Sequence, residues 1–382
     1  MESVFWICLL GVLYAYFLYP GVLLTLGKFR PKPLSIDKEA SLPEVSIIMP
    51  VHNEAEVIAT KLRNLQQLDY PPDLLNVVIV SDGCTDDTVP TIRTFTSSLN
   101  LTVVELEERK GKANALNRGL EAVKSELVVF SDASILLEPE SLANIVRPFS
   151  DPDVGCVSGE DHIAEGGGEG LYGQYELFLR NQESAIGSIV GASGSFYAER
   201  AVICKPFEEG LAPDFLSVLN TVSAGYRAVT EPTARGHMKA VKSSSQEFER
   251  KVRTLLRGMT ALFKKAHLLN PLHYGLFSVF LISHKLMRWL VPVFLVGALL
   301  SNMFLLDQTM YKLIFIAQII FYSLATLSCY TRLSLTQSIV GKIPLFFVLV
   351  NLAILAAWFR YLRGDRQELW TPSKRTDSES VN

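Results

Sequence analysis

The sequence predicts an α/β domain built on a parallel sheet, with membrane-spanning helices at both ends of the chain. Short apolar runs rich in β-branched residues alternate with helical stretches between residues 45 and 132, which is typical of a doubly wound sheet. Residues 4–26 contain no charged side chain, and about 20 such residues are enough to cross a bilayer. The C-terminal third of the chain holds further apolar segments.

A transmembrane helix is therefore expected over residues 1–26. A cleaved signal peptide is the alternative, but such a peptide begins with positive charge. Here Glu2 precedes the apolar run, and Lys28, Arg30 and Lys32 follow it. Because basic residues mark the cytoplasmic side of a span, the next domain is expected in the cytoplasm and the protein in the cell membrane.

The segment after the domain is expected to return to the membrane. Residues 271–288 mix apolar and basic side chains, which suits a helix lying in the membrane interface. About three spans are expected over residues 289–362, followed by a polar tail over residues 363–382. One span before the domain and three after it would put the tail outside, although its basic residues favour the inside. Either one of the four predicted spans is wrong or one segment is re-entrant, so the side of the C-terminus stays open.

The composition and motifs of the chain argue against some classes of partner and cofactor. The chain of 382 residues has a formal net charge of -3, which does not favour a nucleic-acid partner. Its five cysteines form no CxxC pair and are expected to be reduced and structural. No GxGxxG motif follows the first predicted strand, which argues against a dinucleotide cofactor.

The α/β domain is expected over residues 45–270, after a linker over residues 27–44. Asp86 and Asp87 are expected to cap a helix, and the glycines 166, 167, 168 and 170 to form a flexible loop. Predicted strands cover residues 45–49, 76–82, 101–106 and 127–132, and predicted helices cover 54–68 and 112–124.

Two of these strands end in the same Ser-Asp pair, at Asp82 and Asp132. In parallel sheets, ligands bind outside the carboxyl ends of the strands. Two carboxylates at this edge indicate a site for a nucleotide and a metal ion. A third aspartate, Asp214, follows the apolar run Leu211-Ala212-Pro213.

Six segments resemble, in order, the motifs of family 2 glycosyltransferases with the GT-A fold. The resemblance covers about residues 44–260 and implies a Rossmann-like nucleotide-sugar-binding domain. It also implies inverting transfer of a hexose or N-acetylhexosamine from a nucleotide sugar, expected to be a UDP-sugar, to a lipid-linked or growing glycan acceptor. The six segments are Pro50-Val51-His52-Asn53-Glu54-Ala55, Ser81-Asp82-Gly83-Cys84-Thr85-Asp86-Asp87-Thr88, Lys110-Gly111-Lys112-Ala113-Asn114-Ala115-Leu116-Asn117-Arg118-Gly119, Ser131-Asp132-Ala133-Ser134, Gly191-Ala192-Ser193-Gly194-Ser195-Phe196 and Pro213-Asp214-Phe215.

The resemblance implies a nucleotide-sugar site formed by Pro50, His52, Glu54, Asp82, Lys112 and Asp132. At its strand end, Asp82 can accept a hydrogen bond from the ring N–H of a uracil-like base. Glu54 would help to hold the base or ribose, or else only favour a helix N-terminus. Lys112 enters a helix, where positive charge is poorly placed unless an anion such as a diphosphate lies nearby. A solvated loop is the alternative for Lys112.

Asp132 is the candidate metal ligand. Departure of a nucleoside diphosphate leaves charge that a hard divalent cation, Mg2+ or Mn2+, can neutralise when carboxylate and phosphate oxygens hold it. Family members usually carry a second aspartate two positions later, where this chain has Ser134. Ser134 would bind such a cation only weakly, and His237 is a further candidate ligand, with a purely structural histidine as the alternative.

Asp214 resembles the catalytic base of the family, and Gly194 and Ser195 resemble its acceptor-side motif. A carboxylate is needed there because an alcohol is a poor nucleophile until its proton is removed. The family usually has a pair of acidic residues, and here Pro213 replaces the first. A helix cap is the alternative role for Asp214.

Arg250 and Arg253 lie in a basic, amphipathic helix ahead of the membrane, where they would meet acidic headgroups, the donor diphosphate or only solvent. Polymerising relatives carry Gln-x-x-Arg-Trp near here, but no tryptophan follows either arginine. A processive polysaccharide synthase therefore remains an alternative to single transfer. A non-catalytic nucleotide-sugar-binding membrane protein is the other alternative, because Ser134 and Pro213 depart from the family pattern.

Overall fold

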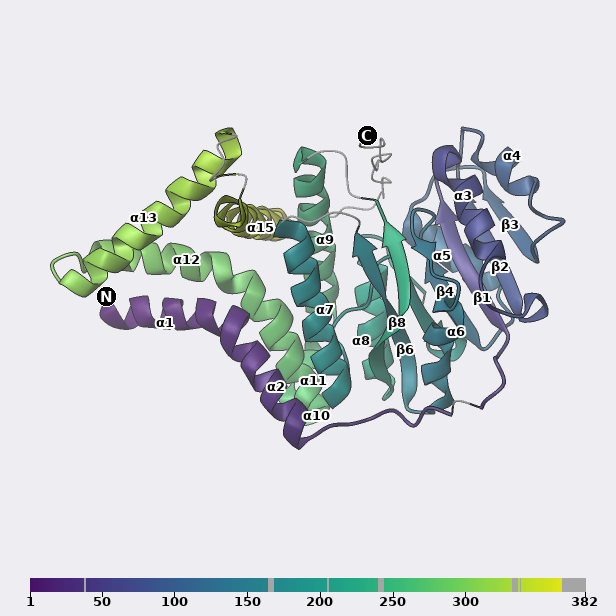
Figure 1. The fold of residues 1–382 in the computed structure, drawn as a ribbon, viewed down its shortest axis with the longest axis horizontal. Coiled ribbons are helices and arrows are strands. Elements are labelled where there is room, and N and C mark those ends of the chain that lie inside the picture. The colour runs from purple at the N-terminus through teal and green to yellow at the C-terminus, as the bar shows by residue number, and fades with distance from the viewer. Residues whose placement is uncertain are drawn as a thin grey trace.

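A mixed eight-stranded sheet forms the centre of the α/β domain, with helices on both faces (Figure 1). The structure is a computed structural model that describes residues 1–37, 39–163, 168–204, 206–239, 244–331, 336 and 338–365. Its strand order is β3-β2-β1-β4-β7-β6-β8-β5.

One half of the sheet is parallel, as the sequence predicts. It consists of β1 (Val45–Val51), β2 (Leu75–Asp82), β3 (Leu101–Leu106) and β4 (Leu127–Ser131). Every residue of β1 and β4 is buried, because helices cover both faces. β1 continues past the predicted stop at Pro50. Proline is tolerated there because the pairing of β1 with β4 ends at Ile48, so no β4 ladder is interrupted.

The other half of the sheet is largely antiparallel, which the sequence did not predict. β7 (Phe196–Arg200) runs antiparallel to both β4 and β6 (Val154–Ile163). β8 (Arg227–Met238) pairs in parallel with β6, and the short β5 (Leu136–Leu137) pairs antiparallel with β8. The reversal at β7 brings the acceptor-side motif, which ends where β7 begins, next to the end of β4.

The helices of the domain are α3 (Ala55–Gln66), α4 (Thr88–Arg93), α5 (Lys112–Glu121), α6 (Ser141–Val146), α7 (Gly168–Ile186), α8 (Pro213–Ser223) and α9 (Ser244–Lys264). Asp86 accepts hydrogen bonds from Thr88 and from the backbone N–H of Ala55, so it caps α3 as well as the start of α4. Asp87 is the N-cap residue of α4, but its side chain makes no capping bond. Gly168 and Gly170 belong to the first turn of α7 instead of a loop, and Gly166 and Gly167 lie outside the described residues.

Four helices in the described part of the chain are long and apolar enough to cross a membrane: Glu2–Phe29, Leu276–Met303, Thr309–Tyr330 and Ile339–Leu362. The first comprises α1 (Glu2–Leu13), a π-helical turn and α2 (Tyr19–Phe29), and the second comprises α11 (Leu276–Phe280), a π-helical turn and α12 (Met287–Met303). The others are α13 (Thr309–Tyr330) and α15 (Ile339–Leu362), and the short α10 (Pro271–Tyr274) precedes α11. Figure 1 shows these long helices on one side of the molecule, with α7 and α9 between most of them and the sheet.

The second of these helices differs from the sequence-based boundaries, which separate an interfacial helix over 271–288 from a span that begins at 289. The structure has one helix from Leu276 to Met303. The basic residues that suggested an interface, such as His284 and Arg288, are buried against α7 instead of facing headgroups. Of the predicted polar tail, residues 366–382 lie outside the described residues.

A buried polar network joins the apolar helices to the α/β domain. Glu183 on α7 accepts a hydrogen bond from Tyr19 (2.6 Å), on α2, and pairs with His284 Nδ1 (2.7 Å). Glu176, about two helical turns earlier, contacts His284 Nε2 (3.0 Å) and forms an ion pair with Arg288. Breaking one member of such a network leaves a buried charge without its partner, which is costly. The network therefore fixes how α2 and the Leu276–Met303 helix sit on α7.

Candidate active site

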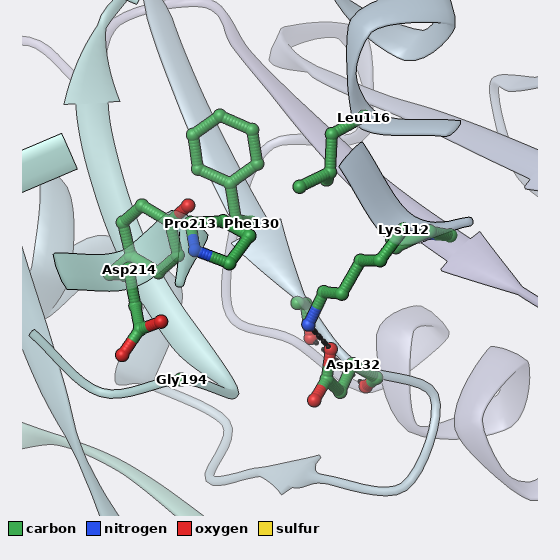
Figure 2. Close-up of a pocket in the computed structure, with 10 residues that line it drawn as sticks. Lys112, Leu116, Phe130, Asp132, Gly194, Pro213 and Asp214 are labelled. Carbon is green, nitrogen blue, oxygen red and sulfur yellow. Dashed lines mark hydrogen bonds and ion pairs between the residues drawn. The ribbon is translucent and has the colours of Figure 1, made fainter. Parts of the chain in front are cut away.

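A small pocket opens at the carboxyl ends of β1 and β4, where the sequence predicts a ligand (Figure 2). Asp132 and Lys112 lie on one side of it, and Asp214 and Gly194 lie on the other. The lining residues are Pro50, Lys112, Leu116, Phe130, Ser131, Asp132, Gly194, Tyr197, Pro213 and Asp214. Five of the predicted site residues thus share one pocket.

Asp132 directly follows β4 and forms an ion pair with Lys112, with 2.6 Å between Oδ1 and Nζ. Both side chains are largely buried, being 25% and 13% exposed, so water screens the pair less than it would at the surface. The backbone N–H of Asp132 donates to the carbonyl of Ser195, at 3.0 Å. That bond ties the predicted metal ligand to the predicted acceptor motif.

The residues near Asp132 fit a cation that is shared with a diphosphate, rather than one held by protein alone. Among the described residues, no group of three or more His, Cys, Asp or Glu side chains is placed to hold a metal ion. Divalent cations such as Mg2+ are commonly held by one or two carboxylates together with substrate phosphates, and Asp132 supplies one carboxylate.

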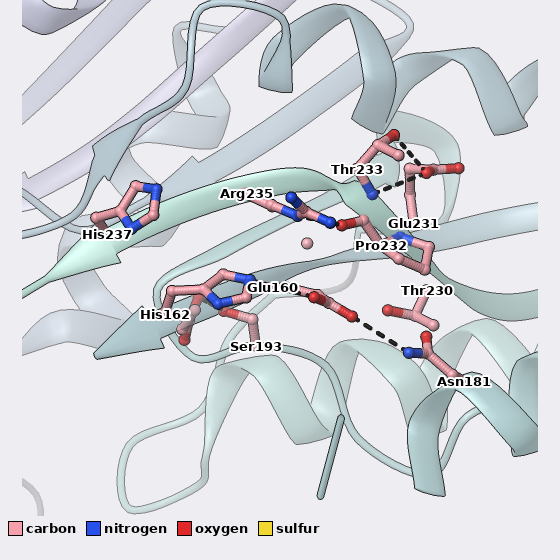
Figure 3. A network of polar contacts seen from close by, with 12 residues as sticks. Glu160, His162, Asn181, Ser193, Thr230, Glu231, Pro232, Thr233, Arg235 and His237 are labelled. Atoms are coloured by element: carbon pink, nitrogen blue, oxygen red, sulfur yellow. Dashed lines mark hydrogen bonds and ion pairs between the residues drawn. The ribbon is translucent and has the colours of Figure 1, made fainter. Parts of the chain in front are cut away.

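His237 is engaged elsewhere in the structure. Its Nε2 atom lies 2.8 Å from Glu138 Oε1, and its ring centroid lies 5.7 Å from that of His162. Figure 3 shows His237 on β8 beside His162 on β6, with Glu160 contacting His162 and Asn181. A role for His237 at a cation held by Asp132 stays a prediction, because the contact with Glu138 engages only one of its two ring nitrogens.

Asp82, at the end of β2, fixes the loop that leads into α5. Its two carboxylate oxygens accept hydrogen bonds from the backbone N–H groups of Lys110 (2.7 Å) and Gly111 (2.8 Å), and its side chain is buried. Gly111 has φ +95°, a conformation that favours glycine. His52 Nδ1 lies 2.7 Å from the carbonyl oxygen of Asp82. Asp82 thereby connects the first motif, through His52, with the motif that begins at Lys110.

Asp82→Asn should weaken nucleotide binding by at least about tenfold, or ~1.4 kcal/mol. The amide replaces one of the two acceptor oxygens by an N–H donor, which would face either a backbone N–H of the loop or the uracil N–H, so one accepted hydrogen bond would be lost. Calorimetry with UDP measures the effect. Unchanged affinity in a folded variant would remove Asp82 from the donor site.

Glu54 is the N-cap residue of α3, and its side chain makes no capping bond. Its backbone N–H donates to Thr88 Oγ1 at 2.8 Å. The first-strand motif is therefore anchored to the second-strand motif through the backbone. A role for the Glu54 carboxylate in ribose or base binding stays a prediction.

Asp214 is in the first turn of α8, directly after Pro213. A Cβ atom built on Gly194 would lie 3.7 Å from Asp214 Oδ2, so the glycine leaves room in front of this carboxylate. Burial raises the pKa of Asp214 above its usual value, while the charge of Lys112 and the helix-start backbone N–H groups act in the opposite direction. A raised pKa makes an ionised carboxylate a stronger proton acceptor.

Three charged residues at the site were missed in the sequence analysis. Arg257, on α9, is buried and donates to the carbonyl of Leu211 (3.0 Å); burial lowers its pKa, although the charge of Asp214 acts in the opposite direction. Asp161 accepts a hydrogen bond from Ser193, and burial raises its pKa to about 6. Lys61 is buried and donates to Ser131, next to Asp132. Arg257 extends the spacing of Arg250 and Arg253 by one helical turn, which is the only sequence signal for any of the three.

Arg250 and Arg253 occupy the same helix but differ in their contacts. Arg250 forms an ion pair with Glu247, 2.6 Å apart. Burial and the neighbouring charge of Arg250 lower the pKa of Arg253, whose side chain is half-buried. Neither residue lines the pocket that contains Asp132 and Asp214. Their predicted roles toward headgroups or a diphosphate stay predictions.

Comparison with known proteins agrees with this site. Residues 46–198 match the family described as Glycosyl transferase family 2. The Poly-beta-1,6-N-acetyl-D-glucosamine synthase of Staphylococcus aureus (strain COL) is 24% identical over 276 residues, which are 69% of this chain and 64% of that protein. The synthase of Staphylococcus epidermidis is 27% identical over 162 residues, which are 42% of this chain and 37% of that protein. The matched regions thus span less than two thirds of these relatives.

Among solved structures, the mannosyltransferase PcManGT from Pyrobaculum calidifontis, in complex with GDP-Man and Mn2+, aligns with a TM-score of 0.72 and 25% identity. The alignment covers 96% of this chain and 99% of that chain, so it includes the apolar helices as well as the α/β domain. The part of the chain over residues 46–198 thus resembles family 2 glycosyltransferases, and the fold of nearly the whole chain is similar to that of a mannosyltransferase.

Proposed function

We propose that the protein transfers a sugar, with inversion, from a UDP-sugar to a lipid-linked or growing glycan acceptor at the cytoplasmic face of the cell membrane. The observation that carries this proposal is the arrangement of one pocket. Lys112 and Asp132 lie on the side where a diphosphate would depart, and Asp214 lies across from them beside Gly194. Attack from the side opposite the leaving group inverts the anomeric centre.

On the donor side, we assign the base and ribose to Pro50, His52, Glu54 and Asp82, and the diphosphate to Lys112. A divalent cation, Mg2+ or Mn2+, supplies charge neutralisation for the departing diphosphate when it is bound. Asp132 is its protein ligand, with Ser134 as a weak neighbour. The PcManGT structure, which contains Mn2+ together with GDP-Man, supports this assignment.

On the acceptor side, Asp214 takes the proton of the attacking hydroxyl, and Gly194 and Ser195 form the wall against which the acceptor lies. The carbonyl of Ser195 accepts a hydrogen bond from the backbone N–H of Asp132, so the backbone links the donor side of the site to the acceptor side. The four apolar helices support an acceptor that reaches the site from the bilayer.

A second donor is favoured by one finding. The PcManGT structure, which covers nearly this whole chain, contains GDP-Man. Transfer of mannose from GDP-mannose is therefore the alternative to a UDP-sugar. Calorimetry with UDP and GDP separates them: we expect UDP to bind at least about tenfold tighter, and the reverse order would replace the UDP-sugar by GDP-mannose in the proposal.

Polymer synthesis is the other candidate function, and the staphylococcal poly-N-acetylglucosamine synthases support it. The helix over Ser244–Lys264 contains no tryptophan, unlike the Gln-x-x-Arg-Trp segment of polymerising relatives. We therefore favour addition of one or few sugars. Product length, measured by mass spectrometry after incubation with excess donor, distinguishes the two.

The α/β domain is expected on the cytoplasmic side, because Lys28, Arg30 and Lys32 follow the first apolar helix. A single cysteine placed at the exposed Lys32 of a cysteine-free variant should not react with an impermeant maleimide on intact cells, and should react after permeabilisation. Labelling of intact cells would place the domain outside.

A further inference from the structure

Lys61 is a fully buried lysine on α3, with 0% of its surface exposed. Lysines are almost never fully buried without a partner, since taking an ammonium group out of water is costly. Its Nζ atom donates hydrogen bonds to Ser131 Oγ (2.9 Å) and to the carbonyl oxygen of Ile135 (2.7 Å). These two acceptors flank Asp132 on the chain.

Asn64, one helical turn further along α3, holds the next part of the same segment. Its Nδ2 atom donates to the carbonyl of Leu137, and its Oδ1 atom accepts from the N–H of Leu137, both at 2.8 Å. One face of α3 thus supports residues 131–137 from the core side. Lys61 supports the part that contains Asp132, and Asn64 supports the part that forms β5.

Two lysines are close to the Asp132 segment. Lys112 forms an ion pair with Asp132 itself, and the buried Lys61 contacts Ser131, the residue before it. Burial lowers the pKa of Lys61 to about 7, while the charge of Asp132 acts in the opposite direction. Lys61 makes no ion pair within 4.0 Å in the described part of the chain, so its direct contacts are with the two acceptors that flank Asp132.

Lys61 does more than fill space in the core, because its two hydrogen bonds both go to the segment that contains Asp132. An apolar side chain of similar length would fill the same space without the cost of burying an ammonium group, but it would leave the carbonyl of the buried Ile135 without this donor. What an apolar side chain could not do is bridge Ser131 and Ile135. Two hydrogen bonds, which hold the segment between Ser131 and Ile135, therefore offset the cost of burying the ammonium group.

We propose that Lys61 is the positioning residue for Asp132: by bridging Ser131 Oγ and the Ile135 carbonyl, it holds the carboxylate where the donor diphosphate and its divalent cation meet. This inference rests on the proposed function, because it takes Asp132 as the cation ligand. Lys61 itself contacts neither donor nor cation.

The test is the gain in UDP affinity that Mn2+ produces, measured by calorimetry with and without the metal, which needs no acceptor and no turnover. In Lys61→Met, the bridge is absent and the volume is nearly kept. We expect UDP affinity without metal to stay within about twofold of the wild type, because Asp82 and the loop after it are untouched. The Mn2+-dependent gain should fall at least about tenfold.

Asn64→Ala is the matched control, since it removes support from Leu137 on the same helix face but leaves the bridge around Asp132. Its Mn2+-dependent gain should stay within about threefold of the wild type. If Lys61→Met does not fold, as judged by circular dichroism, Lys61→Gln replaces it. The glutamine is uncharged and retains one donor group, so a smaller loss in the same direction is expected.

A folded Lys61 variant with the wild-type gain would overturn the inference alone. Equal losses in the Lys61 and Asn64 variants would also overturn it, because they would indicate general loosening of the segment. If the wild-type protein itself shows no gain with Mn2+, the assignment of Asp132 under the proposed function fails, and this inference fails with it. The two kinds of failure are thus told apart by the wild-type measurement.

Discussion

Asp214→Asn should lower kcat by about 10²–10⁴-fold, the usual contribution of a general base. The asparagine keeps the shape of the side chain at the start of α8 but cannot accept the hydroxyl proton. Donor binding should change little, because Asp214 lies across the pocket from Lys112 and Asp132. Initial rates at saturating acceptor, together with UDP affinity by calorimetry, measure both quantities.

The pH dependence provides an internal check on Asp214. Burial raises its pKa, so the wild-type rate should rise with pH through a midpoint above the ordinary aspartate value, because only the ionised form accepts a proton. The asparagine variant should lack this acidic limb. Wild-type kcat in the variant, or loss of UDP affinity in its place, would show that the base is elsewhere. Glu208 and Glu209, a few residues upstream, would then be the first to test; Glu208 pairs with Lys264, and Glu209 accepts a hydrogen bond from the N–H of Asn114.

Asp132→Ala should abolish detectable turnover while leaving the thermal midpoint of unfolding nearly unchanged. The carboxylate is the single acidic group that we assign to the cation, and it lines the pocket without belonging to the hydrophobic clusters. Its removal also takes a negative charge away from the predicted diphosphate side, so UDP alone should bind no more weakly than to the wild type. Turnover and differential scanning fluorimetry, with and without Mn2+, give the comparison.

Ser134→Ala is the control for this prediction, because Ser134 stands where relatives have a second aspartate but is expected to contribute little. Its activity should stay within about threefold of the wild type. Full activity of either the wild type or the Asp132 variant in excess chelator would refute the role of the cation. Charge neutralisation would then fall to Lys112 and to the arginines of α9.

The parallel half of the sheet could be predicted because its strands are buried on both faces and therefore appear as continuous apolar runs. β3 matches its predicted range, and β1, β2 and β4 differ from theirs by one or two residues. The reversal at β7 could not be predicted. Its direction depends on pairing with β4 and β6, and a five-residue strand carries no sequence signal for the direction of its neighbours.

The helix over Leu276–Met303 shows a second limit. A basic residue in an apolar segment is typical of a membrane interface, but it is equally compatible with a buried ion pair. Only the position of α7 decides between them, because Glu176 and Glu183 supply the carboxylates that His284 and Arg288 contact. Those carboxylates are about a hundred residues away in the sequence, so no local pattern reveals them.

The same distinction applies to the residues of the site, because some belong to recognisable motifs and others do not. Asp132, Lys112 and Asp214 follow recognisable motifs, and the structure brings them into one pocket. Lys61 and Arg257 reach this region from the middle of ordinary amphipathic helices, where a lysine or arginine is usually solvated. Their burial follows from the packing of α3 and α9, which sequence periodicity does not specify.

The measurement that tests the central claim most directly is release of nucleoside diphosphate by the purified protein in lipid nanodiscs, supplied with Mn2+ and a panel of UDP- and GDP-sugars. An extract of membrane lipids and glycans provides the acceptor. We predict that one donor class releases its diphosphate, that release requires the acceptor extract, and that Asp214→Asn suppresses it. Binding of a nucleotide sugar with no release from any donor, under conditions where the protein is folded, would contradict the account and favour a non-catalytic nucleotide-sugar-binding protein.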